Sequence, residues 1–65
     1  MITIGDKVKI QERCNEGKQN KNVIFEVVAH PYPHARYHDD YVTIKGINTD
    51  IQFKAFAVEF LTLIK

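Results

Sequence analysis

The side chains best suited to chemistry gather in one short segment, His30–Asp40. It holds all three histidines of the chain, one of its two arginines and two of its three tyrosines. Histidine titrates near neutral pH, arginine binds phosphate or carboxylate through two parallel hydrogen bonds, and tyrosine stacks on flat rings. This composition favours a binding loop for a small anionic, nucleotide-like ligand or for another protein. The candidate ligand-binding residues are His30, Tyr32, His34, Arg36, Tyr37 and His38.

The histidines also leave a metal site open as an interpretation. His34 and His38 are four residues apart, so one helical turn would place both imidazoles on one face, and Asp39 or His30 could add a third ligand. The two prolines of the segment prevent a helix from reaching back to His30. Pairs of histidines at this spacing are common by chance, and we predict no bound metal and no cofactor. A solvated loop stiffened by its prolines is the simplest alternative.

No nucleophile and base can be paired from the sequence. Cys14 is the only cysteine, which excludes an internal disulfide, and it lies in a polar stretch beside only Arg13. Asp39 and Asp40 are adjacent, so their carboxylates point apart and are better suited to capping a turn. We therefore predict that the chain is not an enzyme.

Size and composition predict one globular domain over residues 1–65. Apolar residues make up 45% of the chain and charged residues 26%, which are ordinary globular values. A core this small gives marginal stability, and small domains often gain the rest from a metal, a disulfide or a partner chain. With a disulfide excluded, we expect a homo-oligomer.

The charge balance argues against a dedicated nucleic-acid-binding protein, because the chain has nine basic and eight acidic residues and a net charge of +1. A local basic stripe from Lys7, Lys9, Lys45 and Lys54 keeps nucleic acid open as a partner. Apolar runs are far shorter than the ~20 residues that cross a bilayer, and Gly5-Asp6 follows the first four residues, so we expect no membrane association, no signal peptide and a cytoplasmic location.

Alternating apolar and polar residues predict five strands, at 7–11, 22–29, 41–45, 51–56 and 61–64. In the fourth, Phe53 should face away from Phe56. Residues 12–22 should form a long loop without an anchor in the core, 46–50 a hairpin loop, and 57–60 a single tight turn. An alternative for the last quarter is a helix, because Phe53, Phe56 and Phe60 also sit at helical spacing.

Two motifs resemble the SH3-like small β-barrels. Gly5-Asp6-Lys7-Val8-Lys9-Ile10 is similar to their opening strand, and residues 56–64 are similar to their closing turn and last strand. The superfamily includes KOW-type and Tudor-like domains, the ferredoxin-docking subunit of photosystem I and small phage proteins. The resemblance implies an all-β fold, a five-stranded SH3-like barrel with a one-turn 3-10 helix before the last strand. Lys21-Asn22-Val23 lacks the glycine of the KOW pattern, which disfavours KOW-style RNA binding.

Barrel size limits where a ligand can bind. A five-stranded barrel is filled by its own side chains and cannot enclose the roughly 300 Å³ that a small ligand needs. We therefore expect a ligand site between subunits, in a protein that binds or sequesters a small anionic ligand. By analogy with small phage proteins, it would be a viral accessory protein in the host cytoplasm. The alternative is a nucleic-acid or protein adaptor that uses a basic face or an open barrel edge.

Overall fold

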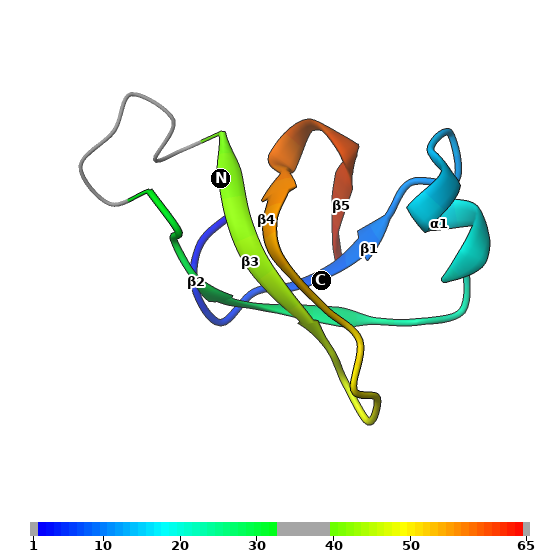
Figure 1. The fold of residues 1–65 in the computed structure, drawn as a ribbon, viewed down its shortest axis with the longest axis horizontal. Coiled ribbons are helices and arrows are strands. Elements are labelled where there is room, and N and C mark those ends of the chain that lie inside the picture. Colours follow the sequence, from blue (N-terminus) through cyan, green and yellow to red (C-terminus); the bar gives the residue numbers. More distant parts are fainter. Residues whose placement is uncertain (1, 33–39, 65) are drawn as a thin grey trace.

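The computed structural model describes residues 2–32 and 40–64. These residues form β1 (Lys7–Ile10), α1 (Asn15–Gln19), β2 (Phe25–Ala29), β3 (Tyr41–Gly46), β4 (Gln52–Ala57), the 3-10 turn η1 (Val58–Phe60) and β5 (Leu61–Ile64). The strands make one antiparallel, strongly curved sheet in the order β4-β3-β2-β1-β5 (Figure 1). The prediction of a small all-β domain with five strands and a 3-10 turn before the last one is confirmed.

The core lies on the concave face of the sheet, where alternation directs the apolar side chains. Phe25 and Val27 of β2 are fully buried, whereas Ile24 and Val28, on the other face, are 37% and 40% exposed. β2 is the middle strand of the sheet, and its outer face carries apolar residues that the described chain leaves partly exposed. The buried apolar residues are Val8, Ile10, Phe25, Val27, Val42, Ile44, Phe56 and Leu61.

A β-bulge changes the alternation in β4. Val42 pairs with Phe56 and Ile44 pairs with Phe53. Between these two pairs β4 contains one residue more than β3. The extra residue lets both phenylalanines pack on the core, with ring centroids 5.3 Å apart. The prediction that Phe53 and Phe56 face opposite ways is therefore wrong. Phe53 and Phe56 are three residues apart, and the bulge allows residues at this spacing to share one face of a strand. The helical alternative for this segment is therefore wrong too.

Thr43 stabilises the bulge from the facing strand. Its side chain is buried, and its hydroxyl donates a hydrogen bond to the carbonyl of Lys54. A bulge interrupts the regular ladder of backbone hydrogen bonds, so a carbonyl at the interruption needs another donor. The threonine side chain supplies a donor at the interruption.

The predicted long loop after β1 contains the short helix α1, which is anchored to the core. The half-buried Cys14 packs against the core residues, and its Sγ lies 3.2 Å from the carbonyl oxygen of Gln11. Gly17 is buried, and a Cβ there would lie 1.8 Å from the same oxygen. The prediction of a loop without an anchor was wrong because the helix is held by this close backbone approach rather than by an apolar stripe.

β5 closes the sheet against β1. Lys7 pairs with Ile64 and Ile10 with Leu61, and the backbone N–H of Gln11 donates to the Phe60 carbonyl at 2.8 Å. The first and last strands are thereby joined through η1. Of the helices in residues 2–32 and 40–64, none has the length and apolar composition needed to cross a bilayer.

Candidate functional site

Two of the six predicted ligand-binding residues belong to the described part of the chain. The other four lie outside it: His34, Arg36, Tyr37 and His38. His30 directly follows β2 and is half-buried. Tyr32 is 41% exposed. Their assignment to a ligand site stays a prediction.

An aromatic contact joins Tyr32, within the His30–Asp40 segment, to Tyr41, which directly follows the segment. The rings of Tyr32 and Tyr41 pack edge to face, with centroids 5.8 Å apart and planes at 90°. This is a favourable arrangement for two aromatic rings. Tyr41 is the first residue of β3, so the contact joins the chain beyond the end of β2 to the start of β3.

The described residues do not gather metal ligands. Within 2–32 and 40–64, no three histidine, cysteine, aspartate or glutamate side chains lie together as a metal site would require. The pair singled out by its spacing, His34 and His38, lies outside these ranges, and a metal site there stays a hypothesis.

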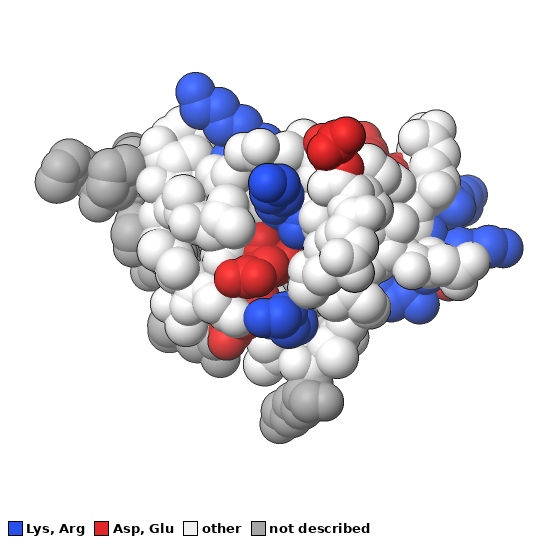
Figure 2. Space-filling view, turned by 90° about the horizontal axis from the view of Figure 1, so that it is seen from below, with Lys and Arg blue, Asp and Glu red and all other residues white. Residues whose placement is uncertain are grey.

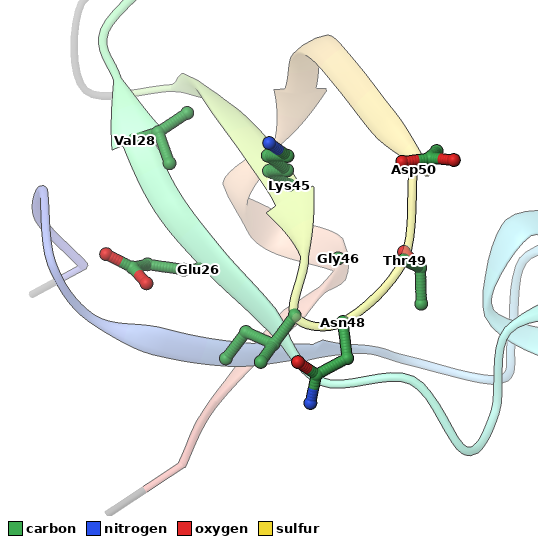
Figure 3. A pocket seen from close by; sticks show the side chains of 8 residues that line it. Glu26, Val28, Lys45, Gly46, Asn48, Thr49 and Asp50 are labelled. Carbon is green, nitrogen blue, oxygen red and sulfur yellow. The ribbon is translucent and has the colours of Figure 1, made fainter.

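A hollow of about 510 Å³ lies on the outer face of the sheet, beside the β3–β4 hairpin. Glu26 and Val28 come from β2, Lys45 from β3, and the remaining wall is the hairpin loop (Figure 3). Its volume lies within the range of small-molecule sites, but it is open to solvent on one side. The lining residues are Glu26, Val28, Lys45, Gly46, Ile47, Asn48, Thr49 and Asp50.

A dense set of hydrogen bonds holds the hairpin wall in place. The N–H of Gly46 donates to the Ile51 carbonyl at 2.8 Å, and the N–H of Ile51 donates to Thr49 Oγ1 at 3.1 Å. A Cβ on Gly46 would lie 2.1 Å from that hydroxyl oxygen, so the loop needs glycine there. Asn48 takes a left-handed φ of 65°, which asparagine tolerates well.

Charges of both signs line the hollow. In Figure 3, Glu26 and Asp50 lie on opposite sides of Lys45. Glu26 also forms an ion pair with Lys7, Nζ to Oε1 3.6 Å, in which both side chains are nearly half exposed. The hollow therefore does not offer the concentrated positive charge that a phosphate group would require.

The proposed lysine stripe is interrupted. Lys7, Glu26 and Lys45 are direct neighbours across β1, β2 and β3, so a carboxylate separates the two ammonium groups. Figure 2 shows the same pattern on one face of the molecule, where acidic side chains lie between basic ones. An alternating row of this kind is poorly suited to a polyanion.

Sequence reasoning identified Lys45 as exposed but overlooked the hollow around it. Two signals pointed there: the outward positions of β2, which alternate with the buried Phe25 and Val27, and the glycine that opens the hairpin loop. The position of the hairpin loop beside Glu26 and Val28 could not be predicted from the sequence, because it depends on the curvature of the sheet.

Comparison of the chain with protein-family models, with curated proteins and with solved structures found no match.

Proposed function

We propose that the chain is a non-enzymatic binding module that holds a small anionic, nucleotide-like ligand between subunits. The observation that carries this proposal is the packing of the described interior. Eight apolar side chains fill it, and the hollow on the outer face is open to solvent. Small-molecule ligands are usually enclosed by their binding site. A ligand of this protein would therefore need a second chain to cover it.

The anionic preference is drawn from the residue types of His30–Asp40 rather than from the hollow. Arg36 is the residue best able to bind a phosphate. Tyr32, exposed at one end of the segment, offers a ring on which a base can stack. The carboxylates of Glu26 and Asp50 make the hollow unfavourable for a phosphate, which supports phosphate contacts from the segment instead.

A thermal-shift screen tests this proposal directly. Nucleoside mono-, di- and triphosphates and cyclic nucleotides are compared with the matching nucleosides. A ligand at 100 times its Kd stabilises the native state by about 2.7 kcal/mol, which raises the Tm of a domain this small by roughly 10 °C or more. We expect phosphorylated compounds to raise the Tm and nucleosides to have little effect.

Arg36→Ala is the variant that links the shift to the segment, with Lys18→Ala on the exposed face of α1 as its matched loss of positive charge. We expect Arg36→Ala to abolish the nucleotide-induced shift without changing the Tm of the free protein, and Lys18→Ala to retain the shift. The proposal would be wrong if the full set of nucleotides left the Tm unchanged, or if Arg36→Ala responded like the unaltered protein.

A protein adaptor is the second candidate, and the outer face of the sheet favours it over a nucleic-acid adaptor. Glu26 and Lys45 there stand beside exposed apolar side chains, Ile24 and Val28. Mixed charges around apolar groups suit protein contacts, whereas nucleic acid would require a continuous basic surface. We expect no binding of single-stranded or duplex oligonucleotides at low salt, measured by fluorescence anisotropy.

A further inference from the structure

The outer face of the sheet carries a charge pair that is complementary to itself. Glu26 of β2 and Lys45 of β3 are direct neighbours in the register, and both line the outer hollow. Two adjacent groups of opposite charge are complementary to the same two groups of a second copy when a two-fold axis passes between them. That axis would place each Glu26 opposite the partner's Lys45, and so would form the pair twice.

The neighbouring apolar row obeys the same symmetry. Ile24, just before β2, and Ile47, just after β3, lie next to each other, because the N–H of Ile47 donates to the Ile24 carbonyl at 2.8 Å. Ile24 is 37% exposed, and Ile47 lines the hollow with Lys45. An axis along the strands, between β2 and β3, would set each Ile24 over the partner's Ile47. One operation therefore pairs both rows.

Glu26 can take part in this contact while keeping its ion pair with Lys7. A carboxylate has two oxygens and about four sites for hydrogen bonds, and the Lys7 ammonium, 3.6 Å from Oε1, cannot occupy all of them. The side chain of Glu26 is 42% exposed, so it can reach a group above the sheet. The alternative axis, across the strands and through this row, would set like charges against each other.

We propose that the chain forms a symmetric homodimer through the outer faces of β2 and β3, with reciprocal pairs between Glu26 and the partner's Lys45. The occupant of this face is a second copy of the chain, since the charges and the isoleucines fit it under a single axis. Packed sheets lie about 10 Å apart, which lets side chains from both copies meet over the hollow.

The dimer also bears on the ligand site, although it does not depend on it. A two-fold axis parallel to the strands leaves the strand direction unchanged, so both copies of β2 end, and both copies of β3 begin, at the same end of the dimer. The described ends of the two His30–Asp40 segments would then lie on the same side of the assembly. The inference goes beyond the proposed function, because the protein without ligand is expected to dimerise.

Charge reversal tests the proposal through sedimentation velocity over a concentration series. The variants are Glu26→Lys and Lys45→Glu, each measured alone and in a 1:1 mixture. Each variant alone sets like charges against each other at two positions, and we expect the dimer Kd to rise about tenfold or more. In the mixture the reversed charges face each other correctly, and we expect the dimer to return.

Glu12→Lys and Lys18→Glu are matched reversals at exposed positions outside the proposed interface, and we expect them, alone or mixed, to dimerise like the unaltered protein. The double variant Glu26→Lys/Lys45→Glu restores both pairs within one chain, so its recovery separates lost pairing from lost folding. The proposal would be overturned by a monomeric unaltered protein at high concentration, by a dimer that ignores both reversals, or by a mixture that fails to recover. A dimer that ignores both reversals would overturn this interface and leave the Arg36-dependent nucleotide shift untouched, whereas a monomeric protein would also contradict a ligand site between subunits.

Discussion

The guanidinium of Arg13 lies over the ring of Phe60, 4.7 Å from the ring centroid. The same group donates to the Glu59 carbonyl at 2.8 Å and to Gln11 Oε1 at 2.7 Å. Arg13 therefore ties the chain after β1 to the 3-10 turn that leads into β5. This contact explains how an exposed arginine in a polar stretch can contribute to the closure of the sheet.

Replacing Arg13 should weaken this closure. We expect Arg13→Ala to lower the free energy of unfolding by about 1–2 kcal/mol, through loss of an exposed cation–π contact and of charged hydrogen bonds. Arg13→Lys keeps the charge but not the planar fork, and should fall in between. Urea denaturation followed by circular dichroism measures the change. Lys21→Ala, also exposed, serves as the control, and equal midpoints for Arg13→Ala and this control would contradict the assignment.

Gly17→Ala should destabilise the protein, although alanine is the better helix former. In an exposed helix the exchange gains about 1 kcal/mol. Here the new Cβ would lie 1.8 Å from the Gln11 carbonyl oxygen, and backbone atoms cannot move aside cheaply. We expect a net loss of roughly 1–3 kcal/mol in the unfolding free energy. Gln19→Ala on the same helix should stay within about 0.5 kcal/mol of the unaltered protein. A stabilised Gly17→Ala protein would show that α1 does not pack as described.

Thr43→Val should reveal the energetic role of the bulge contact. Valine matches threonine in shape but leaves the Lys54 carbonyl without the hydroxyl donor, at a cost of about 1–3 kcal/mol. Thr43→Ser keeps the donor and should lose less. Thr62→Val, at an exposed position of β5, is the matched control and should be nearly neutral. Thermal unfolding measures all three, and equal effects at positions 43 and 62 would mean that the hydroxyl is not needed.

Much of the fold follows from local alternation. Val8 and Ile10, and then Phe25 and Val27, occupy every second position, and the structure buries all four. The bulge could not be predicted this way, because a bulge in β4 is set by its pairing with β3 and not by its own residues. Helix α1 was missed for a related reason, since Gly17 is needed for a close approach to the backbone of Gln11, just after β1.

For the candidate site too, the residue types could be predicted from the sequence and their spatial arrangement could not. The residue types of His30–Asp40 are visible in the sequence, and so is the outward direction of Glu26 and Lys45. That these two are neighbours is a property of the β2–β3 register, which depends on how the chain returns between the strands. The self-complementary pattern of charges therefore becomes visible only once the strands are aligned.

The pairing of Lys7 with Ile64 has a consequence for how the protein is made. β1 lies between β2 and β5, so one of its edges stays unpaired until residues 61–64 have left the ribosome. Contacts between such distant parts of a chain form slowly. We expect the sheet of a nascent chain to stay incomplete until residues 61–64 have emerged, so that the pairing of β5 with β1 is the last step of its assembly.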